Sequence, residues 1–390
     1  MKRIVVAALA AAVAVGGSPA RAADHIKLGF EVGLSGPLAI IGAEMKRGLD
    51  LALELHHNKL GGVPVTTYVV DDKADPAEAT RVSSKLIDED KVDIVTGLMA
   101  SNTDIAVEKS YLDAGIFVVG ALAGPQQFAG KECHADAFHV SFENEDWDDA
   151  VAEYMNREGV KSVYFMGADY QAGWEKIGGA MRHYRGKAIG PVYTPLNQLD
   201  FSAELAQLSA ANPQAVFVFY PGGLGIAFLK QFAEAGLQGK IAVYSEDAMA
   251  NEFSFKAEGD AALGVIQAGS WSAELDNPAN KEFVAAFEKK YGRRPVNFAA
   301  LQYDAINLID SAVAAVHGKI EDKAAFRAAL RKADFQSVRG PFKFNNNQYP
   351  IVNIYFSKVV KDPDGNLRAA LLGSPIENFQ DLYHQQCPLK

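Results

Sequence analysis

The sequence predicts an α/β protein made of two Rossmann-like lobes, each a doubly wound parallel sheet covered by helices. Strand-like and helix-like segments alternate along the chain, and the same alternation starts again after Asn144. The strand-like segments are short β-branched runs with little polar alternation, which is typical of parallel strands covered on both faces. A chain of 390 residues is long enough for two domains of ordinary size.

The first lobe is predicted from the alternation before residue 144. Met45, Leu49 and Leu53 recur at helical spacing, and Pro76 stands where a helix tolerates proline, at its first turn. The expected strands are 26–30, 65–70, 92–96 and 116–120, and the expected helices are 45–57 and 76–90.

The second lobe repeats the pattern after residue 144. Its expected helices are 146–158, one starting near 173, 202–211 and 224–235, and its expected strands are 162–166, 189–193, 215–220 and 241–244.

Helices are expected at 280–291, 298–317 and 322–333, followed by a strand at 351–360. Because this block has too few strands for a third sheet, we expect its helices to cover the first lobe and its last strands to join the second. The chain would then cross between lobes near 141–145, 270–274 and 341–346. The predicted division is a leader at 1–22, an N-terminal lobe at 23–143 plus 273–344, and a C-terminal lobe at 144–272 plus 345–390.

The first residues have the pattern of an export signal. Lys2 and Arg3 precede an apolar run at 4–15, and Ala20-Arg21-Ala22 is a small-x-small cleavage site, so we expect cleavage before Ala23. The alternative, a membrane anchor, needs an apolar run of roughly 20 residues. The mature protein is therefore expected in the periplasm or outside the cell.

Cys133 and Cys387 are the only cysteines, so they allow a single pairing. In an oxidising compartment we predict that they form a disulfide. The alternative is two buried free thiols.

Charge and motifs exclude several functions. With 38 Lys+Arg against 48 Asp+Glu the chain lacks the basic excess of a nucleic-acid-binding protein. The segment 223–228 has Phe228 where a dinucleotide fingerprint needs a small residue, and 124–132 has the wrong spacing for a phosphate loop. No metal-binding or serine-hydrolase motif is found, so we expect no cofactor, no metal and no catalysis. Asp71-Asp72 is interpreted as a polar strand end rather than a catalytic pair.

Ligands of doubly wound sheets bind beyond the carboxyl ends of the strands. After strand 92–96, Ser101, Asn102 or Thr103 could cap the next helix, and free amides at a helix start favour a carboxylate; an ordinary N-cap is the alternative. The small side chains of 121–125 would let a ligand approach the backbone.

The second lobe contributes Tyr170, Tyr220 and Glu246 at the corresponding ends of its strands. Aromatic side chains with few polar groups fit a small, partly apolar organic ligand. Taken singly, each aromatic residue is more typical of a core.

Several motifs carry a family resemblance over nearly the whole mature chain. Gly33-Leu34-Ser35-Gly36-Pro37, 59–62 and the loops above resemble the periplasmic branched-chain amino-acid-binding proteins of ABC importers. The segments 199–205, 221–225, 275–280 and 337–340 are similar to the branch of that family associated with aromatic acids such as substituted benzoates.

The resemblance implies the type I periplasmic binding protein fold: two lobes, three interlobe crossings and a ligand cleft between the lobes. By position, it implies that the ligand is bound by Ala100, Ser101, Asn102, Ala121, Ala123, Tyr170, Tyr220, Glu246, Trp271 and Phe298. In this set, alanine methyl groups stand where the amino-acid binders have hydroxyl groups. Glu246 matches the acid that holds an α-amino group, whereas Ile41 and Ala172 replace family aromatics.

The resulting hypothesis is a monomeric solute receptor that closes over a ligand and presents it to an ABC permease in the inner membrane. Aromatic monocarboxylates are the first ligand class, and branched-chain or aromatic amino acids are the second. A secreted hydrolase is a remote alternative. A ligand-sensing partner of a signalling receptor is a further alternative, because fold does not fix function.

Overall fold

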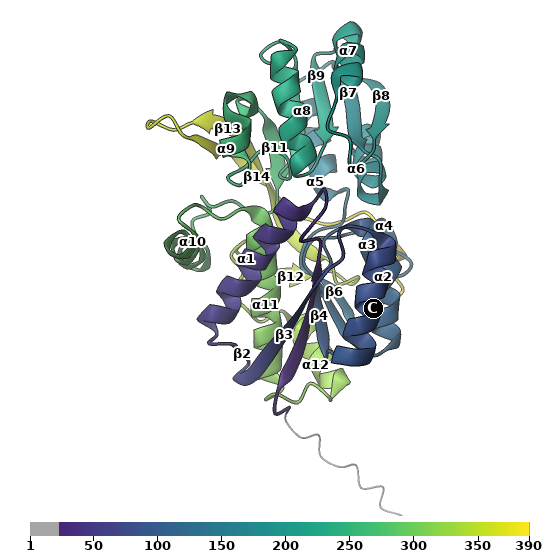
Figure 1. Ribbon diagram of the computed structural model, residues 1–390, viewed down its shortest axis with the longest axis vertical. Helices are drawn as coiled ribbons and strands as arrows, with labels where there is room; N and C mark the ends of the chain where they lie inside the picture. The colour runs from purple at the N-terminus through teal and green to yellow at the C-terminus, as the bar shows by residue number, and fades with distance from the viewer. Residues whose placement is uncertain (1–22, 390) are drawn as a thin grey trace, which may run out of the picture.

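The computed structural model describes residues 23–389, so the predicted leader lies outside the described residues. Figure 1 shows two lobes, one above the other, each made of a sheet with helices on its faces. The first sheet is built from the early part of the chain and the second from its middle and end.

In the described part of the chain, the first sheet has six strands in the order β2-β3-β1-β4-β5-β6, and β2 alone runs antiparallel to its neighbour. The strands are β1 (Ile26–Val32), β2 (Lys59–Leu60), β3 (Val63–Asp71), β4 (Ile94–Gly97), β5 (Phe117–Gly120) and β6 (Ala137–His139). The helices are α1 (Ala39–Leu55), α2 (Pro76–Ser84) with its π-helical continuation η1 (Lys85–Asp90), α3 (Ser101–Asp113) and α4 (Gln126–Ala129).

The second sheet, within residues 23–389, has eight strands in the order β12-β13-β11-β10-β9-β7-β8, with β14 paired to β13. The strands are β7 (Ser162–Ala168), β8 (Lys187–Thr194), β9 (Ala215–Phe219), β10 (Ala242–Glu246), β11 (Ile266–Gly269), β12 (Lys343–Phe344), β13 (Pro350–Lys361) and β14 (Leu367–Phe379). The helices are α5 (Asp146–Arg157), α6 (Gln171–His183), α7 (Ser202–Ala211), α8 (Gly223–Glu234), α9 (Phe255–Glu258) with the short turn η2 (Gly259–Ala262), and η3 (His384–Gln386).

The late helices α10 (Pro278–Tyr291), α11 (Asn297–Ala315) and α12 (Lys323–Lys332) return to the first lobe, as predicted. In Figure 1, α11 lies beside α1, and the two helices are in direct contact. The reason is visible in the sequence: α11 is apolar along most of its length, and Leu301, Ile306 and Ile309 are fully buried.

The chain passes between the sheets after β6, after β11 and before β12, which agrees with the expected crossings. α1 starts at Ala39, several residues earlier than expected, because Ile40 and Ile41 continue its apolar face. The long strand β14 was not predicted. The finer lobe boundaries, 23–143 plus 273–344 and 144–272 plus 345–390, stay predictions.

Among residues 23–389, none of the helices combines the length and the apolar character that crossing a membrane would require.

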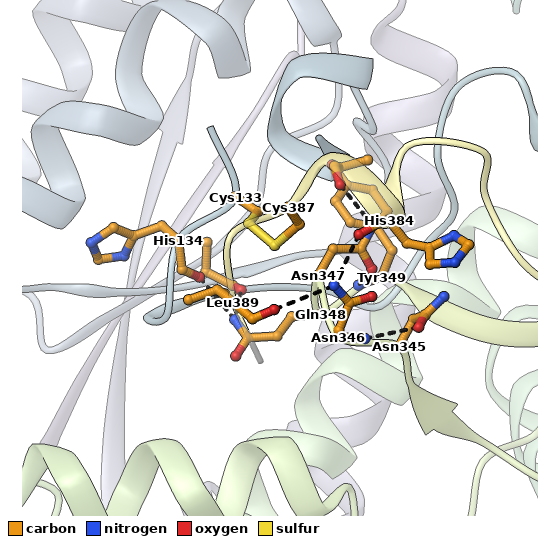
Figure 2. The surroundings of a disulfide bond; sticks show 12 residues. Cys133, His134, Asn345, Asn346, Asn347, Gln348, Tyr349, His384, Cys387 and Leu389 are labelled. Carbon is orange, nitrogen blue, oxygen red and sulfur yellow. Dashed lines mark hydrogen bonds between the residues drawn. A yellow bond between two sulfur atoms is a disulfide. The ribbon is translucent and has the colours of Figure 1, made fainter. Parts of the chain in front are cut away.

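The C-terminal segment returns to the first lobe at a cysteine pair (Figure 2). Cys387 lies against Cys133, in the loop between α4 and β6, with their Cα atoms 5.7 Å apart. Nearby, the Asn347 side-chain amide donates to the Ala129 carbonyl at 2.8 Å, and the Gln348 amide donates to the His134 carbonyl at 2.9 Å. The Asn346 side-chain amide donates to the His384 carbonyl at 2.9 Å, so the C-terminal segment is held by the cysteine pair and by a turn that itself contacts the first lobe.

Candidate ligand-binding site

A cavity lies between the two lobes, at the carboxyl ends of their central strands. Both lobes and α11 contribute to its lining, which is mostly apolar and aromatic. The lining residues are Leu38, Ile41, Met99, Ser101, Leu122, Ala123, Phe142, Asn144, Tyr170, Ala172, Lys176, Phe219, Pro221, Glu246, Ala248 and Phe298. Its position and chemistry are those of a binding site for a small organic molecule.

The first-lobe wall is shaped by a tight turn after β4. Gly97 has a φ of +100°, and a Cβ there would lie 2.3 Å from the Glu31 carbonyl oxygen, so only glycine fits. The turn places Ser101 at the cavity as the first residue of α3.

The start of α3 differs from one expectation. Ala100 is the N-cap and makes no side-chain capping bond, so the cap expected from Ser101, Asn102 or Thr103 was wrong. The hydroxyl of Thr103 instead donates back to the Ala100 carbonyl at 2.9 Å. The first amides of a helix have no acceptor inside the helix, so they are available to an anion.

Polar groups connect this wall to the second lobe. The Asn144 side-chain amide donates to Ser101 Oγ at 3.0 Å and to Glu175 Oε2 at 2.6 Å. Glu175 also accepts from the Gln126 backbone amide at 3.4 Å. The lobes are therefore joined by hydrogen bonds at the edge of the cavity.

A buried ion pair occupies the second-lobe wall. Lys176 Nζ donates to Glu246 Oε2 at 2.5 Å and to Asp148 Oδ2 at 3.3 Å, and it also donates to the Asn144 carbonyl at 2.9 Å. Lys176, Glu246 and Asp148 are all at most 3% exposed. Burial opposes the charge of the ammonium, but Asp148 and Glu246 outweigh it and raise the pKa of Lys176 above its usual value.

Aromatic rings surround this ammonium. Lys176 Nζ lies 4.7 Å from the ring centre of Phe142 and 5.2 Å from that of Phe219, both of which line the cavity. Tyr170 stacks on Phe219 with ring centres 6.1 Å apart. The second-lobe wall thus offers ring faces together with a carboxylate that is already neutralised.

The lobes touch at the mouth of the cavity. Gly222 has a φ of +61°, and a Cβ there would lie 3.1 Å from Ile40 Cγ2 in the opposite lobe. Any larger side chain at this position would press on α1, so the described conformation is a closed one.

The predicted site residues divide between the cavity and other places. Ser101, Ala123, Tyr170, Glu246 and Phe298 line the cavity.

The remaining predicted residues lie outside this lining. Ala100 and Ala121 are buried next to it, and the Asn102 amide donates to the Ala74 carbonyl at 3.1 Å. Tyr220 is fully buried and packs against Phe228, with ring centres 5.3 Å apart. Trp271 lines a separate cavity and donates to Asn280 Oδ1 at 2.7 Å.

Sequence reasoning missed Lys176, Phe142, Asn144 and Phe219. Phe142 and Asn144 lie in a segment predicted only as an interlobe crossing, and Lys176 is one lysine on a helix, with no motif around it. Successive residues of a strand point in opposite directions, so the sequence indicates that only one of Phe219 and Tyr220 faces the cavity, but it does not say which one.

Comparison with known proteins agrees with this architecture. Residues 25–365 match the family described as periplasmic binding protein. The Leu/Ile/Val-binding protein homolog 6 of Brucella melitensis is 27% identical over 374 residues, covering 94% of this chain and 95% of that protein.

Two solved structures are similar in fold and sequence. The solute-binding protein of an ABC transporter from R. palustris in complex with benzoate has a TM-score of 0.87 and 28% identity, covering 94% of this chain and 100% of that one. A solute-binding protein from Rhodopseudomonas palustris BisB5 in complex with 3,4-dihydroxybenzoic acid has a TM-score of 0.84 and 28% identity, covering 92% and 99%.

Proposed function

The chain belongs to the periplasmic binding protein family, and we propose that it is the solute receptor of an ABC importer for an aromatic monocarboxylate of the benzoate type. The family consists of solute-binding receptors rather than enzymes. The ligand would lie in the cavity between the lobes, with its carboxylate toward the start of α3 and its ring against Tyr170, Phe219 and Phe298.

The observation that carries this proposal is the ion pair between Lys176 and Glu246. An α-amino acid needs a free carboxylate for its ammonium group, and Glu246 is the acid at that position. Here Glu246 already receives an ammonium from the chain itself, at 2.5 Å. A second ammonium beside Lys176 would be repelled, whereas a ligand without an amine meets a neutralised, aromatic wall.

Two similar structures, which hold benzoate and 3,4-dihydroxybenzoic acid, support the same ligand class. A ring hydroxyl, where the ligand has one, would reach toward Glu246 and donate to it.

The second candidate is an amino-acid receptor, which the relation to Leu/Ile/Val-binding protein homologues favours. The two candidates are separated by a matched pair of ligands, 3-phenylpropanoate and phenylalanine, which differ only in the ammonium group. Calorimetry is expected to detect binding of benzoate, 4-hydroxybenzoate and 3-phenylpropanoate but not of phenylalanine, leucine or isoleucine. Tight binding of phenylalanine with no binding of benzoate would contradict the proposal.

We further propose that residues 1–22 are removed on export, that the mature chain is a periplasmic monomer, and that it delivers ligand to an inner-membrane permease. Co-purification with an ABC permease from the same cells, with and without benzoate, tests the partner. An effect of benzoate on a sensor kinase instead of a permease would favour a signalling role.

A further inference from the structure

A second group of polar side chains lies inside the first lobe, apart from the ligand cavity. Asp104 and Glu108 are one helical turn apart on α3, and His139 ends β6. One oxygen or nitrogen atom from each of the three lies within 4.8 Å of the others. All three residues are at most 1% exposed.

The polar atoms of this cluster are unsatisfied. Within the described residues, both carboxylate oxygens of Asp104 and Oε2 of Glu108 make no hydrogen bond, and the His139 ring lies near the Ala123 backbone without a hydrogen bond of good geometry at either nitrogen. The hydroxyl of Tyr349, whose ring stacks on His139 at 4.4 Å, is also without a hydrogen-bond partner in this part of the chain. Leaving a buried polar atom without a partner costs on the order of 1–3 kcal/mol, so several together point to a missing partner.

The ionisable groups next to this cluster are acidic. Asp72 lies near Asp104, and Glu132 lies near Glu108, so further carboxyl groups surround the two acids. Two carboxylates and a neutral imidazole are a ligand set that divalent transition metals accept.

We propose that Asp104, Glu108 and His139 bind one divalent transition-metal cation of the Zn²⁺ type, which fastens α3 to β6. His139 Nε2 lies 3.4 Å from Glu108 Oε2. Metal–ligand bonds of about 2.0–2.2 Å in a tetrahedron place neighbouring ligand atoms roughly 3.3 Å apart, so this pair already has the required spacing. Asp104 would move inward, and the Tyr349 hydroxyl would donate to a bound carboxylate or to a water in the fourth position.

The position suggests a structural role. Asp104 is one turn along α3 from Ser101, which lines the ligand cavity, and β6 leads directly into the first crossing between the lobes. A cation here would hold the cavity-facing end of α3 in place without touching the ligand.

The test begins with the mature wild-type protein isolated from the periplasm. Mass spectrometry of its metal content is expected to find about one metal per folded chain, as one set of three ligands implies. The protein is then unfolded with a chelator, its disulfide left intact, and refolded with and without Zn²⁺. Zn²⁺ is expected to raise the melting temperature of the refolded protein by several degrees, because it binds only the folded state.

Two variants and a control identify the ligands. Glu108→Gln and His139→Asn are expected to lose the metal and the Zn²⁺-dependent rise in melting temperature. His317→Asn is the matched control, since His317 is exposed and its φ of +53° suits asparagine.

Absence of metal from the wild-type protein together with an unchanged melting temperature in Zn²⁺ would overturn the proposal. The polar atoms of the cluster would then be satisfied by shared protons or by buried water. Full metal content in folded His139→Asn would overturn it equally. If the variants do not fold, the wild-type comparison with and without Zn²⁺ decides.

Discussion

At the scale of single residues, the ligand class depends on which cation pairs with the carboxylate of Glu246. Lys176 and Asp148 belong to the same buried group, so one ammonium faces two carboxyl groups. A buried charge that loses its only partner is costly, but a group of three can lose one carboxylate and remain paired. Substitutions at Glu246 and Lys176 therefore have different expected outcomes.

Glu246→Gln is expected to keep benzoate affinity within about threefold of wild type or to improve it, because it removes a negative charge facing an anionic ligand, and Asp148 still pairs with Lys176. Affinity for 4-hydroxybenzoate should fall instead, since the acceptor for the ring hydroxyl is weakened. Calorimetry with the two ligands measures both effects. A collapse of benzoate binding would contradict this expectation, because it would show that the Glu246 carboxylate is needed to hold a ligand that has no amine.

Lys176→Met is expected to destabilise the fold by about 3–5 kcal/mol, because it leaves Glu246 and Asp148 buried without a cation. Urea unfolding measures this loss. Lys230→Met, at a residue of α8 outside the ion pair, is the control and should change little. Equal stability of the two variants would show that the buried pair contributes nothing.

Phe298→Ala is expected to weaken benzoate binding by roughly tenfold, since it removes apolar surface from the cavity wall at about 25 cal/mol per Å². Tyr220→Ala is the comparison: Tyr220 lies outside the cavity lining, so its loss should lower stability by about 3–5 kcal/mol and leave affinity nearly unchanged in the folded protein. A loss of affinity in Tyr220→Ala matching that in Phe298→Ala would place both rings against the ligand.

At the scale of elements, strands and helices followed the sequence closely where apolar periodicity was strong. The helix expected at 146–158 differs by one residue from the bounds of α5, Asp146–Arg157. Side chains beyond the strand ends were harder to predict, because periodicity does not say whether Phe219 or Tyr220 turns toward the cleft. Lys176 could not be predicted, because its role depends on Asp148 and Glu246, which lie on other elements.

The short helix α9 ends in a buried acid, Glu258, which is 4% exposed. Burial raises its pKa from 4.5 to about 8, and Ser254 lowers it only partly. The folded state therefore holds a proton that the unfolded state releases near pH 4.5, so the free energy of unfolding falls as pH rises toward 8.

Glu258→Gln lacks this titration, so its stability relative to wild type should increase with pH. Each pKa unit corresponds to about 1.4 kcal/mol, which gives a gain of a few kcal/mol between about pH 5 and pH 8. Urea unfolding of both proteins across this range is the measurement, and other buried acids such as Asp149 affect the two equally. Parallel stability profiles would show that Glu258 titrates near its usual pKa.

The cysteine pair links the C-terminal segment to the first lobe across 254 residues of sequence. We predict a disulfide in the exported protein, and mass spectrometry without reductant should find no alkylated cysteine. Replacing both Cys133 and Cys387 with serine should cost about 2–4 kcal/mol, mainly by freeing the unfolded chain. Two alkylated cysteines in the native protein would contradict the pairing.

At the scale of the whole molecule, the two-lobed fold could be predicted because parallel strands covered on both faces leave a clear apolar signature. The cavity between the lobes could be placed only approximately. Its lining combines residues from several loops with Phe298 of α11, and the sequence does not say how closely the lobes approach.

Closure over the ligand is the prediction that belongs to this scale. A ligand bound by both lobes favours the closed state, and without ligand the lobes are expected to open about the three crossings. Small-angle scattering should therefore show a smaller radius of gyration with benzoate than without it, and no change with leucine. An unchanged radius at saturating benzoate would argue against a hinge mechanism.

Gly222 supplies a variant that tests closure independently of ligand chemistry. Its φ of +61° with a ψ of −123° is a backbone conformation that favours glycine, and a side chain there also meets Ile40 across the closed cleft, where even a Cβ would lie 3.1 Å from Cγ2. In its folded fraction, Gly222→Asn should therefore bind benzoate at least tenfold more weakly, because each 1.4 kcal/mol of strain in the closed state costs a factor of ten. Gly239→Asn is the matched control, since Gly239 has a φ of +77° with nothing within 4 Å of a Cβ. If Gly222→Asn contracts with benzoate as fully as Gly239→Asn, the contact between Gly222 and Ile40 does not limit closure, and the ligand binds without bringing the lobes together at this point.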